Sequence, residues 1–284
     1  MSHYFAKPAR LMATAILVSA VGAARVHAQD AASNAAPVDL QIIADGIGKD
    51  VAEILGLPFR QPVAVETQSA DQYAEYIARR IDKQVPKAVR SHYGKIVKTL
   101  GLYRGPEIDD YSAMMTSVMV SQAGAYYDLD KQRFYVLMNK MPDLIRDALY
   151  SHELYHALQD QYFGLARYLN LDHDDPSLNA DQMLARAAVV EGEATYMMTV
   201  YALENAMKKP PPREVLARAV GMQATMSVDQ LRVMVQQPRL AEFIGEDLRN
   251  AARSTEKVPP FILDAMIGVY LKGMGFVFAV QEHG

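Results

Sequence analysis

Apolar residues recur at helical spacing along most of the chain after residue 38, which predicts a mostly helical protein. In the stretch 39–55, for example, these residues are Leu40, Ile43, Ile47, Val51 and Ile54. Three consecutive prolines at 210–212 are expected to end a long helix. The periodicity predicts further helices over 69–81, 91–102, 109–122, 141–163, 181–209, 214–222, 227–236, 240–252 and 259–281.

Strand-like patterns are few and short. Residues 61–67 are rich in β-branched side chains, and two β-rich runs at 123–127 and 133–138 flank a polar turn, which predicts a β-hairpin. The expected fold class is therefore α+β, predominantly α. The pattern favours an N-terminal part over 39–140 followed by a helical part over 141–284, and it also fits one continuous domain over 39–284.

The first 28 residues have the pattern of a secretory signal peptide. Lys7 and Arg10 precede an apolar run at 11–23, and Val26 and Ala28 occupy the −3 and −1 positions of a cleavage site. The run is shorter than the roughly 20 residues that span a bilayer. We therefore expect cleavage after Ala28, a mobile leader over 29–38, and a periplasmic or secreted protein. No other segment is expected to cross a membrane, so no stable membrane span should remain after cleavage.

The composition narrows the classes of function. A chain that is 50% hydrophobic and 22% charged can bury a real core, so disorder over its whole length is excluded. The 29 basic and 33 acidic residues give a formal net charge of −4, which provides no basic field for nucleic acid. The absence of cysteine excludes disulfides, a thiol nucleophile and cysteine-ligated metals.

One motif carries chemistry: His152, Glu153 and His156 form H-E-x-x-H within the helix predicted over 141–163. Positions i and i+4 are separated by only about 40° around a helix, so both imidazoles project from one face and can hold one Zn²⁺. Glu153 would then lie close enough to a water on that metal to act as general base.

The placement of the two histidines favours a metal over a pair of ordinary core histidines. His152 and His156 share an apolar stripe of the helix with Ile145, Leu149 and Phe163, so they are expected to face the interior. Buried imidazoles beside a carboxylate are costly unless something organises them, and a metal ion does so.

A catalytic zinc needs a third protein ligand. The compact metzincin pattern fails, because Gln159 and Tyr162 stand where its glycine and third histidine should be. The downstream candidates are His173, in an acidic loop that is more simply a solvated turn, and Glu191 or Glu193 in the next apolar helix. A carboxylate buried in such a helix needs a partner.

The segments HELYHALQDQYF at 152–163 and VVEGEAT at 189–195 resemble the gluzincin zinc metallopeptidases, and most closely an extracytoplasmic branch with HELxHALQDQ…VEGEA. The resemblance implies a zincin-like fold in which the hairpin of about 123–138 is the edge of a small sheet, packed on the H-E-x-x-H helix, that aligns a peptide substrate. It further implies one Zn²⁺ held by His152, His156 and Glu191, with Glu193 not a ligand.

Helical spacing supports the same choice between the two glutamates. Glu191 continues an apolar stripe at steps of three and four, whereas Glu193 is about 200° around the helix from it. Gly192 between them places no bulk beside the site and suits a close approach of the two ligand helices. The stripe consists of Leu184, Ala187, Glu191, Ala194, Met198 and Ala202.

Four further residues have two interpretations each. Asp160 follows His156 by four positions and either orients that ligand or faces solvent. Tyr126, Tyr127 and Tyr270 either pack in the core, the simpler interpretation, or help to polarise a scissile carbonyl.

Two functions of different classes are compatible with these residues. The first is an exported zinc hydrolase, most simply a metallopeptidase acting on a peptide or protein, with Glu153 as its base. The alternative is a non-catalytic envelope or binding protein that retains a zinc site. The intact Glu153 favours the hydrolase, because a purely structural metal has no use for a base beside it.

Overall fold

The structure is a computed structural model that describes residues 39–105, 108, 110–137, 141–172, 175–235, 237 and 258–283. The predicted signal peptide at 1–28, the leader at 29–38 and the helix expected over 240–252 lie outside the described residues.

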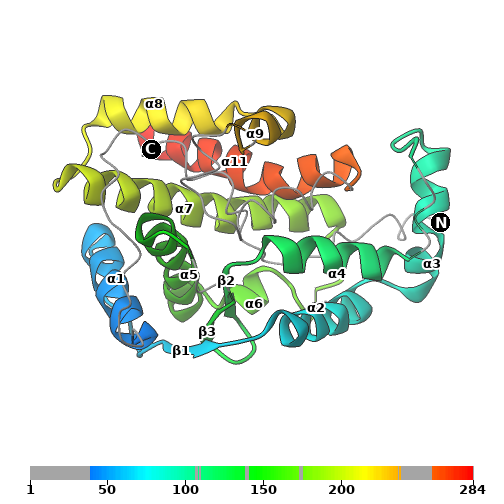
Figure 1. Ribbon diagram of the computed structural model, residues 1–284, viewed down its shortest axis with the longest axis horizontal. Helices are drawn as coiled ribbons and strands as arrows, with labels where there is room; N and C mark the ends of the chain where they lie inside the picture. The colour runs from blue at the N-terminus through cyan, green and yellow to red at the C-terminus, as the bar shows by residue number, and fades with distance from the viewer. Residues whose placement is uncertain are drawn as a thin grey trace.

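The described chain is predominantly helical, with one small sheet (Figure 1). The helices expected around the H-E-x-x-H motif and around Glu191 are present as α5 and α7. The described helices are α1 (Leu40–Leu55), α2 (Ala70–Gln84), α3 (Lys87–Thr99), α4 (Tyr111–Gln122), α5 (Asp143–Phe163), α6 (Leu165–Tyr168), α7 (Ala180–Met207), α8 (Arg213–Ala224), α9 (Val228–Val235) and α11 (Pro260–His283).

The sheet has three described strands in the order β1 (Ala64–Thr67), β3 (Arg133–Val136) and β2 (Ala125–Asp128). Strands β2 and β3 form the predicted hairpin, and β1 pairs with β3 in parallel. Both faces of the hairpin are buried. Its alternate side chains enter two different apolar clusters, with Tyr127 and Phe134 on one side and Tyr126 and Tyr135 on the other.

Helix α5 lies against the hairpin and is crossed by α7, which in turn lies beside α11 and α8 (Figure 1). Side chains of α1, α5, α7 and one face of the sheet share the first apolar cluster. Side chains of α2, α4, α11 and the opposite face share the second. The H-E-x-x-H helix is thereby held between the sheet and the long helix that follows it.

Helices α7 and α11 meet at glycines. A Cβ on Gly192 would lie 2.2 Å from the carbonyl carbon of Gly273, and a Cβ on Gly273 would lie 2.0 Å from the carbonyl oxygen of Ala188. The close approach expected of Gly192 therefore exists, but it is made with α11 rather than with α5. This crossing holds Tyr270, one turn before Gly273, against α7.

Replacing Gly273 by Ala should therefore separate the two helices. We expect the free energy of unfolding to fall by about 3 kcal/mol, because the new methyl overlaps backbone atoms that cannot rotate away. Gly268→Ala is the matched control on the same helix, since nothing lies within 4 Å of its added Cβ. That control should be neutral or stabilising by up to about 1 kcal/mol. Equal urea midpoints for the two variants would contradict the tight crossing.

The prediction that no segment beyond the signal peptide is long and apolar enough to cross a membrane is wrong. Helix α11 is long and apolar enough to do so. Several of its apolar side chains are part of the protein core, among them the buried Ile262, Leu263, Leu271 and Met274. Phe276 and Val280, near the C-terminal end of the helix, are exposed. Packing against α7 and α8 accounts for part of the apolar composition that makes α11 resemble a membrane-spanning helix.

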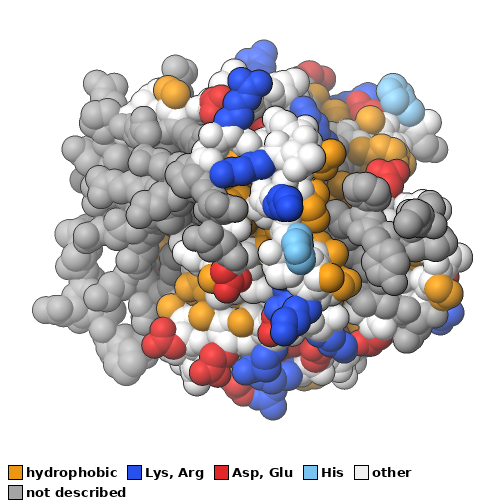
Figure 2. All heavy atoms as spheres, turned by 90° about the vertical axis from the view of Figure 1, so that its right-hand side faces the viewer, with side chains coloured by type: hydrophobic (Ala, Val, Ile, Leu, Met, Phe, Trp, Pro, Cys, Tyr) orange, Lys and Arg blue, Asp and Glu red, His pale blue; other side chains and the backbone are white. Residues whose placement is uncertain are grey.

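Basic and acidic side chains are interspersed over the described surface at the end of the molecule that carries α2, α3 and α4 (Figure 2). Among the described residues, Lys83 and Asp172 form an exposed ion pair at 2.7 Å, and Arg80, which is largely buried, pairs with Asp130 at 3.0 Å. Exposed pairs of this kind contribute little to stability. The described part of this face therefore carries side chains of both charge signs.

Candidate metal centre

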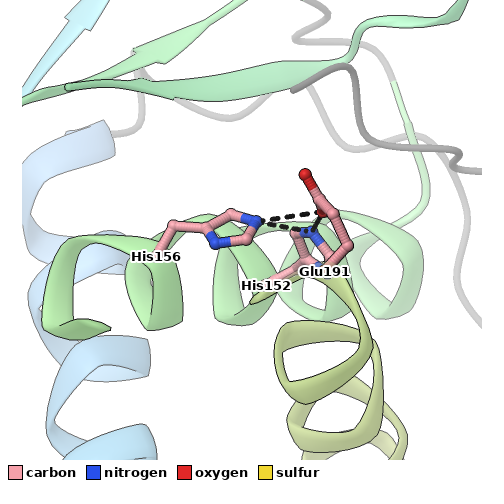
Figure 3. Close-up of side chains that lie close together, drawn as sticks. All are labelled: His152, His156 and Glu191. Atoms are coloured by element: carbon pink, nitrogen blue, oxygen red, sulfur yellow. Dashed lines mark hydrogen bonds and ion pairs between the residues drawn. The ribbon is translucent and has the colours of Figure 1, made fainter. Parts of the chain in front are cut away.

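Two helices bring three potential metal ligands to one point (Figure 3). Helix α5 presents His152 and His156 from successive turns, and Glu191 of α7 points at them from the crossing helix. The two Nε2 atoms are 3.0 Å apart, and each is 3.3 Å from Oε2 of Glu191. Glu191, the third ligand chosen from the sequence, thus lies with both histidines in a group that could hold a metal ion.

The three side chains are removed from solvent. The exposed fractions are 0% for His152, 1% for His156 and 4% for Glu191. Two imidazoles and a carboxylate in such a place are costly unless they are paired or coordinate an ion. Their donor atoms are of the type and spacing that could hold a metal ion.

The electrostatics favour a cation between the three groups. Burial would raise the pKa of Glu191, but the charge of His156 and hydrogen bonds from both imidazoles lower it to about 2. Burial would likewise lower the pKa of His156, and the Glu191 carboxylate raises it to about 9. Glu191 is therefore ionised at neutral pH, and a metal ion would occupy the place that a proton takes on the imidazole.

His156 is oriented by Gln159, not by Asp160. Its Nδ1 lies 2.8 Å from Oε1 of Gln159, which is buried on the same helix. The other histidine differs, because Nδ1 of His152 has no hydrogen-bond partner among the described residues. An acceptor at Nδ1 leaves the lone pair of Nε2 free to bind a metal.

Asp160 fastens the end of α5 to its surroundings. Its Oδ1 accepts from the backbone N–H of Leu165 at 2.9 Å. Its Oδ2 accepts from the hydroxyl of Tyr127 at 3.2 Å and from the amide of Gln132 at 3.3 Å. Neither interpretation of Asp160 is correct: its described hydrogen bonds go to Leu165, Tyr127 and Gln132 and not to His156, and it is only 9% exposed.

Glu153 is buried beside the ligands and faces the hairpin. Its Oε2 accepts the backbone N–H of Tyr127 at 2.9 Å, and its exposed fraction is 1%. Tyr127 belongs to β2, the outer described strand next to α5. The backbone N–H of Tyr127 is therefore donated to the candidate base and is not free to pair with a peptide substrate.

Of the three tyrosines considered, Tyr270 reaches the centre. Its ring is 6.0 Å from the ring of His152, and its side chain hydrogen-bonds to Glu191. Burial raises the pKa of the Tyr270 phenol well above its ordinary value, so the phenol keeps its proton. The hydroxyl of Tyr126 instead donates to Gln68 at 2.6 Å.

Glu193 is not one of the three clustered donors, as its place on the helix predicted. Its Oε2 accepts from the amide of Gln159 at 2.8 Å and from the hydroxyl of Tyr155 at 3.4 Å. His173, the other candidate third ligand, lies outside the described residues. The role of Gln159 was not predicted, although a residue three positions after His156 on one helix lies within contact distance of it.

Comparison of the chain with protein-family models, with curated proteins and with solved structures gives no match. The resemblance to gluzincins therefore rests on the residues of α5 and α7.

Proposed function

We propose that the protein is an exported zinc-dependent hydrolase, most simply a gluzincin-like metallopeptidase. The triangle formed by the donor atoms of His152, His156 and Glu191 carries the proposal. A tetrahedral zinc with ligand bonds of about 2.0–2.1 Å has ligands about 3.3 Å apart. The separations of 3.0, 3.3 and 3.3 Å are close to one face of that tetrahedron. Two histidines and a glutamate are also a known catalytic zinc ligand set, which leaves one position open.

Hydrolysis of a peptide bond also requires a general base, and Glu153 is suited to this role. Zinc in this site would polarise a scissile carbonyl and lower the pKa of a water molecule toward neutrality. Glu153 takes the proton of the attacking water and returns it to the leaving amine. The N–H of Tyr127 holds the Glu153 carboxylate in place, and the Tyr270 phenol does the same for Glu191.

The burial of the site favours a second candidate, a non-catalytic protein with a structural metal. His152, Glu153 and His156 are each at most 1% exposed. A metal with no position for water would have this environment.

Metal analysis of the purified mature protein, combined with a broad peptide-cleavage screen, separates the two candidates. We expect one zinc per chain, cleavage that stops when zinc is removed, and inhibition by a small hydroxamate that binds zinc at its open position. Bound zinc with neither cleavage nor hydroxamate binding would support the structural metal and contradict the hydrolase. Absence of bound zinc would contradict both.

Removal of the signal peptide during export can be tested separately. Mass spectrometry of the mature protein should give an N-terminus at Gln29, because the signal peptidase cleaves after the small residue Ala28. Replacing Ala28 by a bulky residue such as Phe should block this cleavage and serves as the control. A mature, exported protein that still carries residues 1–28 would contradict the cleaved-signal assignment.

A further inference from the structure

The side chain of Gln159 connects His156, a candidate metal ligand on the same helix, to α7. Its Oε1 faces Nδ1 of His156 at 2.8 Å. Its Nε2 faces two oxygens of α7, the backbone carbonyl of Val190 at 3.2 Å and the Glu193 carboxylate at 2.8 Å. Gln159 is 2% exposed, so water does not compete freely for these bonds.

This arrangement permits only one orientation of the amide. An amide nitrogen donates two hydrogen bonds and an amide oxygen only accepts. Rotating the Gln159 amide by 180° would bring its oxygen against the two acceptor oxygens of Val190 and Glu193. The nitrogen must therefore face α7, and the oxygen must face His156.

The orientation of the amide in turn fixes the imidazole. An oxygen at Nδ1 requires that Nδ1 of His156 carry a proton, which leaves Nε2 to point at Glu191 and His152 as a metal donor. We infer that Gln159 is the positioning residue of His156, and that Glu193 acts through Gln159 to keep His156 in its metal-binding tautomer. This inference rests on the proposed metal centre but not on catalysis.

The tautomer can be observed directly in the full-length mature protein loaded with zinc and labelled with ¹⁵N-histidine. We expect His156 to show a protonated Nδ1 whose hydrogen exchanges slowly, with zinc at Nε2. In Gln159→Leu the Nδ1 hydrogen should exchange faster, and zinc affinity measured against a competing chelator should fall by about 10–100-fold. Glu193→Leu should lower the affinity by about 10-fold, since the carbonyl of Val190 remains as an acceptor.

Gln161→Leu is the matched control. Gln161 is also on α5, but its side chain bonds to the backbone of Arg60 and Gln61 instead of to the metal centre. This variant should leave both the zinc affinity and the His156 signal unchanged. A similar loss of affinity in Gln161→Leu and Gln159→Leu would mean that any weakening of α5 has this effect, and would overturn the inference.

Exchanging the two residues tests the coupling even if Gln159→Leu does not fold. Gln159→Glu alone places two carboxylates face to face, so zinc affinity should fall. Combining it with Glu193→Gln restores one donor and one acceptor in the contact, and most of the lost affinity should return. Additive losses in the double variant, or a wild-type His156 signal in every variant, would overturn the inference. An inactive wild type with these metal and tautomer results would count only against the proposed hydrolase.

Discussion

Glu153→Gln should lower zinc-dependent hydrolysis by about 10²–10⁴-fold while zinc stays bound, because general base catalysis contributes about that factor. Glu153 is not one of the three clustered donors, so the metal ligands are unchanged. A glutamine is nearly the same size and can still accept the N–H of Tyr127 through its amide oxygen, so the contact between α5 and β2 can persist. It cannot take a proton from water at neutral pH.

Turnover and zinc content should be measured together on this variant. Glu75→Gln is a control for the same chemical change on the surface, where Glu75 forms an exposed ion pair with Arg79. It should behave as the wild type. Undiminished hydrolysis by zinc-loaded Glu153→Gln would remove Glu153 from the mechanism, whereas loss of zinc from this variant would show that Glu153 supports the metal itself.

The features that depend on helical periodicity could be predicted from the sequence. The spacing of His152 and His156 placed both on the buried face of α5, and steps of three and four selected Glu191 over Glu193. The same argument failed near helix ends. Phe163 is 67% exposed and Leu184 is 37% exposed, because the stripes continue beyond the neighbouring elements that cover them.

Contacts between distant elements could not be predicted in this way. Tyr270 reaches Glu191 only because Gly192 and Gly273 let α11 approach α7, and no local pattern indicates which helix a glycine will contact. The parallel pairing of β1 with β3 is of the same kind, since the strand was recognisable but its partner was not. Likewise the spacing of Gln159 from His156 put it within reach of that residue, but its contact with Glu193 of α7 could not be predicted from the sequence.

Glu191→Ala is expected to have the largest effect on metal binding. Zinc-finger peptides bind zinc through four protein ligands with about 10–16 kcal/mol, so loss of one ligand is expected to cost about 3 kcal/mol, or roughly 10²-fold in affinity. The variant should therefore lose zinc on dialysis and lose hydrolysis with it. Its apo form should keep α7 helical, because alanine is the best helix former.

Glu193→Ala is the matched control, two residues along the same helix. Its carboxylate bonds to Gln159 and Tyr155 and not to a histidine, so this variant should keep one zinc per chain with affinity weakened by no more than about 10-fold. Zinc content measured by atomic emission, beside chelator competition, distinguishes the two variants. Loss of zinc from Glu193→Ala and retention in Glu191→Ala would show that Glu193 is the ligand, which would invalidate the ligand assignment and the helix register on which it depends.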